Sequence, residues 1–133
     1  MGKSALLLIL GLVSLPLHAQ RIHAELDCRF TGTDFVYDCE VRLARGGAPL
    51  AGVQLSIGAD MPSMPMMHNV RPVKATPGAT AGTYQARLEL EMHGDWAVQL
   101  NLSGPARDRV VTILRFDPDK VAPATGARQR HKH

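Results

Sequence analysis

The methionines of this chain are unevenly distributed. Five of the six follow the initiator, and all five fall between Met61 and Met92. Four of them occupy seven positions of one segment, Asp60-Met61-Pro62-Ser63-Met64-Pro65-Met66-Met67-His68-Asn69. Its two prolines stiffen the segment and deny it backbone donors, which favours an irregular loop. Thioethers are soft neutral donors that suit Cu(I), and an imidazole can complete such a site. We therefore treat this segment as a candidate copper-binding loop.

A second group of candidate ligands lies at Met92 and His93. We expect His93-Gly94-Asp95 to form a three-residue hairpin loop, with Met92 facing Trp96 on the core side and Trp96 shielding a bound ion. The loops of a sandwich gather at its two ends, so this loop could meet the methionine segment. The complete set of candidate ligands is Met61, Met64, Met66, Met67, His68, Met92 and His93. One ion would use only part of this set. A soft set would accept Ag(I) as well as Cu(I), and Cu(II) is a further alternative.

Each candidate also has a structural explanation. Methionine commonly fills gaps in a core, which would account for Met92 and for Met61, which continues the inward phase of a strand. A histidine in a turn, such as His93, normally faces water. An exposed apolar loop could also dock another protein without metal. The alternative function is therefore a metal-free immunoglobulin-like interaction module that docks through its methionine-rich loop.

The elements that must position these residues are predicted to be strands. Apolar and polar residues alternate over residues 53–59, 84–90 and 96–102, as expected for half-buried strands. Residues 110–116 form a further strand, and residues 70–76 form a short edge strand interrupted by Pro72. Sustained helical periodicity is absent. The pattern predicts an all-β fold, a small immunoglobulin-like (cupredoxin-like) antiparallel β-sandwich of six to seven strands.

Two cysteines flank a turn-forming segment near the start of the predicted domain. If the chain turns about Thr33 and Asp34, then Cys28 lies opposite Cys39. The same register pairs Phe30 with Tyr37 and Leu26 with Val41, and all six side chains share one face. We therefore expect a structural disulfide. Thiolate metal ligands and a redox pair are the alternatives, although redox cysteines usually lie close together at the start of a helix.

Residues 1–19 have the pattern of a signal peptide. A short positive start is followed by an apolar run, a helix-breaking Pro16 and a small Ala19 at the cleavage position. An uncleaved membrane anchor is the alternative. We expect residues 20–116 to form the sandwich, residues 117–133 to form a disordered basic tail, and the protein to be periplasmic or secreted, without a membrane span after cleavage.

The composition excludes several functions. The chain of 133 residues is 45% hydrophobic and 20% charged, which is typical of one globular domain. Its formal charge of +3 is too small to indicate nucleic acid, and 5% aromatic residues cannot build a base-stacking surface. The sequence contains no recognisable nucleophile–base set, so we do not expect an enzyme.

The motifs together resemble a known family. Met61-Pro62-Ser63-Met64, the nearby His68, Gly82-Thr83-Tyr84 at the start of a strand and Met92-His93-Gly94-Asp95-Trp96 are similar to motifs of the YtkA-like and FixH-like periplasmic domains, over residues 40–116. This resemblance implies an immunoglobulin-like sandwich associated with copper resistance, efflux or delivery to a copper oxidase. The positions that match the family's motif are Met61, Met64 and Met92, and the resemblance implies that they are site residues.

The chain departs from this pattern in two respects. We expect it to lack the transmembrane helix of FixH-like proteins, and it adds Met66, Met67 and the cysteine pair. A more distant resemblance is to periplasmic copper chaperones that use Met and His on a cupredoxin-like sandwich. The expected function is a periplasmic Cu(I)-binding chaperone or buffer. Its expected partners are the copper ion and a periplasmic copper transporter, oxidase or other cuproprotein.

Overall fold

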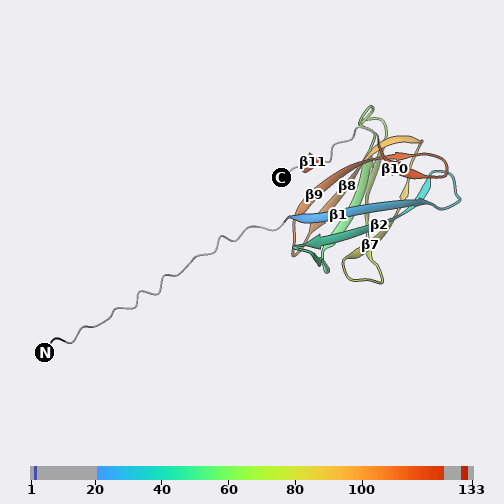
Figure 1. The fold of residues 1–133 in the computed structure, drawn as a ribbon. Helices are drawn as coiled ribbons and strands as arrows, with labels where there is room; N and C mark the ends of the chain where they lie inside the picture. The colour runs from blue at the N-terminus through green and yellow to red at the C-terminus, as the bar shows by residue number, and fades with distance from the viewer. Residues whose placement is uncertain (1, 3–20, 125–129, 132–133) are drawn as a thin grey trace.

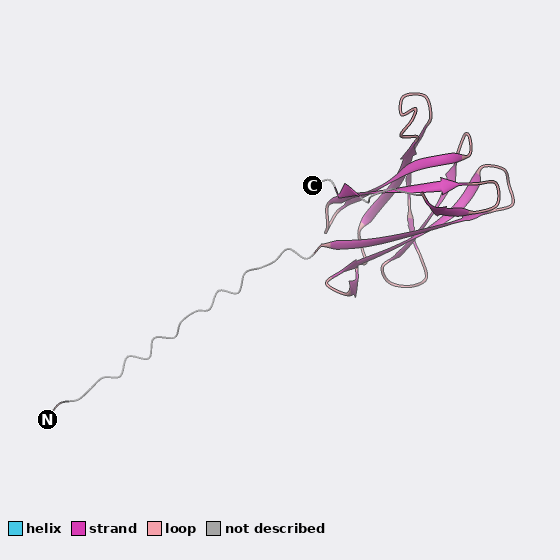
Figure 2. Cartoon of the chain, turned by 45° about the horizontal axis from the view of Figure 1, so that its top comes forward, coloured by secondary structure: helices cyan, strands magenta, loops and turns pink. Residues whose placement is uncertain are grey.

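The fold of the described residues is all-β. The structure, a computed structural model, describes residues 2, 21–124 and 130–131, and within them it contains eleven strands and no helix (Figure 2). The strands form two antiparallel sheets that pack as a sandwich (Figure 1). The predicted signal peptide lies outside the described residues, apart from Gly2. No helix in the described part of the chain is long and apolar enough to cross a membrane.

The first sheet has the order β1-β2-β7-β6, and β3 also pairs with β2. Its strands are β1 (Ile22–Phe30), β2 (Val36–Arg45), β3 (Ala48–Pro49), β6 (Thr76–Pro77) and β7 (Thr83–Glu89). The second sheet has the order β10-β9-β8-β4-β5, and β11 also pairs with β9. Its strands are β4 (Gln54–Asp60), β5 (Asn69–Lys74), β8 (Gly94–Ser103), β9 (Asp108–Phe116), β10 (Val121–Pro123) and β11 (Arg130–His131). Seven strands have six residues or more, in keeping with the predicted six to seven, and the other four have two or three.

The predicted β1–β2 hairpin is confirmed with its register. Cys28 pairs with Cys39, Phe30 with Tyr37 and Leu26 with Val41. The two cysteines form a disulfide, and both are buried. The predicted edge strand is also confirmed, since β5 is the outermost strand of its sheet and contains Pro72. Proline is tolerated there because an edge position can do without one ladder donor.

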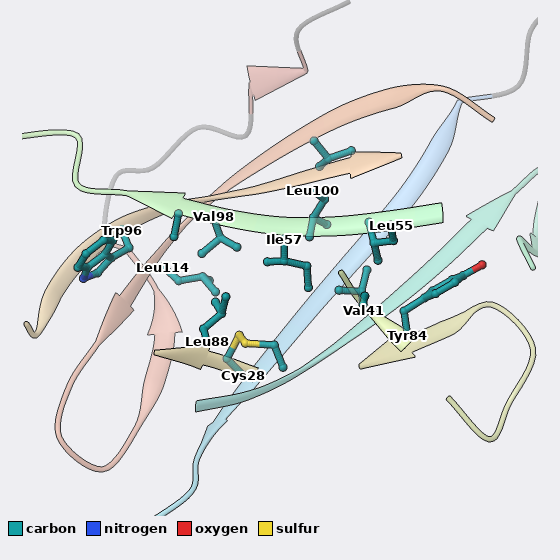
Figure 3. Close-up of a cluster of buried hydrophobic side chains, with 14 of the residues drawn as sticks. Cys28, Val41, Leu55, Ile57, Tyr84, Leu88, Trp96, Val98, Leu100 and Leu114 are labelled. Atoms are coloured by element: carbon teal, nitrogen blue, oxygen red, sulfur yellow. A yellow bond between two sulfur atoms is a disulfide. The ribbon is translucent and has the colours of Figure 1, made fainter. Parts of the chain in front are cut away.

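The core lies between the two sheets and follows the predicted alternation. Trp96, Leu100, Ile57 and Leu88 are fully buried. Figure 3 shows Trp96 at one end of the labelled core side chains and Tyr84 at the other. Burying one large apolar side chain contributes about 1.5–3 kcal/mol, so this layer supplies the main stabilisation of the sandwich. Trp96 thus marks the end of the core that bears the candidate site.

The predicted hairpin between residues 84–90 and 96–102 is wrong. β7 pairs with β2 and β6 in the first sheet, whereas β8 pairs with β4 and β9 in the second. Residues 90–93 therefore cross from one sheet to the other. Alternation shows which face of a strand is buried but not which strand lies beside it, and both arrangements bury the same side chains. Gly94, the glycine of the predicted loop, has a positive φ of 132°.

The predicted disordered tail is wrong for residues 117–124. Asp117 donates its N–H to the Lys120 carbonyl, and β10 then pairs with β9. The Tyr37 hydroxyl donates to the Asp117 carbonyl at 2.7 Å. The segment is short and contains Pro118 and Pro123, so the sequence lacks a strand signal, but the edge of β9 supplies partners for the backbone. Residues 125–129 and 132–133 of the predicted tail lie outside the described residues.

Candidate metal centre

Four connections meet at one end of the sandwich. Val36 at the start of β2 pairs with Glu89 at the end of β7, and Asp60 at the end of β4 pairs with Ala97 near the start of β8. Because residues 90–93 join β7 to β8, these two sheet ends coincide. The connections at this end are residues 31–35, 61–68, 90–93 and 117–120, the last because Phe116 at the end of β9 pairs with Gly94 at the start of β8. The expectation that the methionine loop and the Met92–His93 segment share one end is therefore confirmed.

The methionine loop, residues 61–68, is held by its own backbone. Met61 donates its N–H to the His68 carbonyl at 3.2 Å, which closes the base of the loop. Two further bonds run to the Met64 carbonyl, from Met67 at 3.1 Å and from His68 at 3.2 Å. Backbone hydrogen bonds thus hold the shape of the loop.

The exposed fraction of the methionine side chains differs strongly within this loop. Met61 is 6% exposed and belongs to the core, whereas Met64 is 38%, Met67 74% and Met66 89% exposed. Among the described residues, the large hydrophobic side chains exposed to this degree are Met64, Met66, Met67 and Val73. The explanation of methionine as a core gap-filler therefore fits Met61 but not the other three.

A hydrogen bond between side chains joins the methionine loop to the crossing segment, residues 90–93. His68 Nδ1 lies 2.7 Å from Glu91 Oε2. A carboxylate accepts hydrogen bonds, so Nδ1 is the ring nitrogen that donates to Glu91, and a neutral ring in this arrangement has its lone pair on Nε2. A carboxylate behind one ring nitrogen is the usual support of a metal-binding histidine, because it fixes the ring and makes the other nitrogen more basic. The arrangement leaves Nε2 of His68 available as a ligand.

Glu91 was missed as a site residue by the sequence reasoning. It is 23 positions from His68, and the alternating pattern of the preceding strand suggests only a solvent-facing carboxylate. Its place directly before the candidate ligand Met92 was the available signal.

Met61 and Met92 lie at the junction between the crossing segment and the core. A Cβ at position 94 would lie 3.1 Å from Cε of Met61, so the Met61 methyl group packs against the Gly94 backbone. Met92 is half-buried against the core, and its carbonyl accepts the Trp96 indole N–H at 3.1 Å. The predicted proximity of Met92 and Trp96 is thus present, through the backbone of Met92. Shielding of an ion by Trp96 stays a prediction.

His93 does not simply face water, as expected for a turn histidine. Its ring lies 4.5 Å from the ring of Phe35, centroid to centroid, and it is half-buried. Phe35 belongs to the connection at residues 31–35. Its φ is 65°, a conformation that residues other than glycine rarely adopt. Leu90 donates its N–H to the Phe35 carbonyl at 2.9 Å. His93 therefore contacts the 31–35 turn on one side of the crossing segment.

The sulfur and nitrogen side-chain donors proposed at this end are thioethers and imidazoles. Within residues 21–124, no three side chains among His, Cys, Asp and Glu lie close enough to hold a metal together. Both cysteines are in the disulfide, which leaves the methionines as the sulfur donors. This donor chemistry fits a soft monovalent ion.

The fold and this end of the molecule define a class, an all-β sandwich domain that exposes a methionine-rich loop. The family model described as YtkA-like matches residues 32–101, more than half of the chain, and this range contains both the methionine loop and the crossing segment. The chain belongs to the YtkA-like family. No curated protein and no solved structure gave a significant match.

Proposed function

We propose that this protein is a periplasmic Cu(I)-binding protein, a chaperone or buffer that holds the ion with methionine and histidine side chains. The observation that carries the proposal is the pairing of exposed thioethers with a supported imidazole. Met64 lies in the same backbone turn as His68, whose Nδ1 is bonded to Glu91. This arrangement offers soft sulfur and an available nitrogen at one place on the surface.

The proposed ligands divide by burial. Met64 is exposed and His68 is half-buried, whereas Met61 is buried in the core and Met92 is half-buried against it. Thioethers are neutral at every pH, so binding requires no deprotonation of sulfur. The same donors would take Ag(I), which makes silver a convenient substitute in experiments.

The compartment supports the proposal. A buried disulfide is typical of proteins exposed to an oxidising environment outside the cytoplasm. With both cysteines oxidised, thiolates do not compete with the methionines for the ion. We propose that the partner is a copper transporter, an oxidase or another cuproprotein in that compartment, and that the protein transfers an ion without catalysing a reaction.

A competitive titration tests the proposal. Apoprotein is titrated anaerobically with Cu(I) against a chromogenic chelator, and the variant combines Met61→Leu, Met64→Ser and Met92→Leu. Leucine removes the sulfur of the two buried residues while keeping their volume. The variant should bind at least about tenfold more weakly. The matched control is Val73→Ser, since Val73 is 37% exposed, Met64 is 38% exposed, and valine has no donor atom. Equal affinities of wild type and triple variant would reject these ligands.

The second candidate function is a metal-free interaction module. The exposure of Met64, Met66 and Met67 favours it, because an exposed apolar loop can dock a partner directly. This function predicts that the protein captures its partner in the presence of excess Cu(I) chelator. The copper function predicts that the chelator abolishes the exchange of ions.

A further inference from the structure

The methionine loop contains two thioethers that its proposed site does not use. Met66 is 89% exposed and Met67 is 74% exposed, whereas Met61 and Met64 are 6% and 38% exposed. A ligand that only holds an ion is normally shielded from water and from competing chelators. Met66 and Met67 have the opposite property, because their sulfur atoms are open to any molecule that approaches this end.

The backbone keeps these two side chains at the surface. The bonds from Met67 and His68 to the Met64 carbonyl close a tight turn around residues 65 and 66. Pro65, directly before Met66, has a fixed φ and no N–H with which the turn could be rearranged into a strand. Exposing two large apolar side chains costs free energy of solvation, and no described contact of these side chains with the core offsets this cost.

We propose that Met66 and Met67 are transfer ligands, which pass Cu(I) from the inner donors to a partner protein that itself presents exposed thioethers. This inference rests on the proposed function, since it assumes that the inner donors bind Cu(I). The partner is defined by its chemistry. Its donors must reach a convex, apolar loop, and they must be soft and neutral so that the ion does not prefer one side strongly.

Transfer proceeds as ligand exchange. A bond from copper to a thioether of Met66 or Met67 forms as a bond to an inner donor breaks. A bond to a partner thioether then forms as the bond to Met66 or Met67 breaks. The copper stays Cu(I), every sulfur stays neutral, and no electron or proton moves. One positive charge passes from this protein to its partner.

A second copy of this protein is the probe, because it presents the same thioethers. Untagged protein is loaded with Cu(I) and mixed anaerobically with affinity-tagged apoprotein, and the copper on each fraction is measured over time. The donor and the acceptor are each either wild type or the double variant Met66→Ser/Met67→Ser, which gives four combinations. Self-exchange has an equilibrium constant near one, so the measured quantity is a rate.

The double variant should keep its Cu(I) affinity within about threefold of wild type. Exchange between two copies of the variant should be slower than between two wild-type copies by about tenfold or more, which is the effect of one lost transition-state contact. The mixed pairs should fall between these values. Val73→Ser is again the control, because it removes an exposed apolar side chain without removing sulfur.

The outcomes separate the two proposals. Equal exchange rates in all four combinations, with copper bound in each, would overturn the transfer role and leave the proposed function standing. A large loss of affinity in the double variant would also overturn it, because Met66 and Met67 would then be holding ligands. Failure of the wild type to bind Cu(I) in the titration would remove both proposals.

Discussion

Nδ1 of His68 lies 2.7 Å from Oε2 of Glu91, and this contact joins two connections that come from different sheets. His68 ends the methionine loop between β4 and β5 of the second sheet, whereas Glu91 follows β7 of the first. The contact fixes the orientation of the imidazole through Nδ1, the nitrogen that is not the proposed ligand. We therefore regard Glu91 as a positioning residue of the candidate site.

Replacing Glu91 should weaken copper binding without unfolding the protein. Loss of a carboxylate behind a ligating histidine typically lowers metal affinity about 10–100-fold, so Glu91→Ala should fall in this range. Glu91→Gln should lose less, because its amide oxygen can still accept from Nδ1. The measurement is the Cu(I) competition titration. Glu89→Ala is the matched control, since Glu89 is an exposed glutamate two positions earlier on β7. Equal effects at positions 89 and 91 would argue against the positioning role.

Gly94 should tolerate alanine poorly. Its φ of 132° is unfavourable for any side chain, and a Cβ there would lie 3.1 Å from Cε of Met61. We expect Gly94→Ala to lower the free energy of unfolding by about 1–3 kcal/mol, measured by urea denaturation. Gly47→Ala is the control, because Gly47 has a φ of 76° but no atom within 4 Å of the added Cβ. A loss at position 94 no greater than at position 47 would show that the contact with Met61 contributes nothing.

Tyr37 should make the stability of the protein sensitive to alkaline pH. Burial, with a further contribution from Asp117, raises the pKa of Tyr37 above its ordinary value. The unfolded chain then ionises first. Stability should be unaffected by this group below about pH 10 and should fall as the pH rises from there through the folded-state pKa.

The variant Tyr37→Phe isolates this effect. It loses the hydrogen bond to the Asp117 carbonyl, which should cost about 0.5–1.5 kcal/mol at neutral pH. Above pH 10 the difference in free energy of unfolding between wild type and variant should shrink. The measurement is a series of urea titrations between neutral and strongly alkaline pH. A constant difference across the series would contradict the assignment to Tyr37.

Removing the disulfide should affect stability and not copper binding. The bridge links Cys28 and Cys39, 11 positions apart, on the β1–β2 hairpin. The double variant Cys28→Ala/Cys39→Ala should lose about 2–4 kcal/mol of unfolding free energy. Its Cu(I) stoichiometry and affinity should match wild type when both are measured well below the melting temperature. Lost copper binding in a folded variant would revive the alternative of thiolate ligands.

The sequence predicted well those features that local pattern determines. The register of Cys28 with Cys39 follows from one short turn and the alternation on either side of it, so an error of one residue would have moved every side chain to the wrong face. The methionine loop was evident from composition. Its position at the end of the sandwich followed from the strand phase that leads into Met61.

The features that the sequence did not predict depend on contacts between distant segments. The crossing at residues 90–93 has the same local pattern as a hairpin, and only the pairing of β7 with β2 and of β8 with β4 separates the two. The contact of His93 with Phe35 requires the 31–35 turn to lie beside this crossing. β10 is only three residues long and contains Pro123, which is too little pattern to signal a strand, and it forms because the edge of β9 is available for pairing.

If the protein binds Cu(I) as proposed, the crossing segment makes this binding depend on folding. It supplies Glu91 and Met92, whereas Met64 and His68 lie on the methionine loop that follows β4 of the other sheet, so only the folded chain brings these residues together. A Cu(I) ion that binds only the folded protein would stabilise it and raise its melting temperature. At a free copper concentration 100 times the dissociation constant, binding would raise the free energy of unfolding by about 2.7 kcal/mol. Copper would therefore bind after the chain has folded, and the melting temperature would report the fraction of the protein that is loaded with copper.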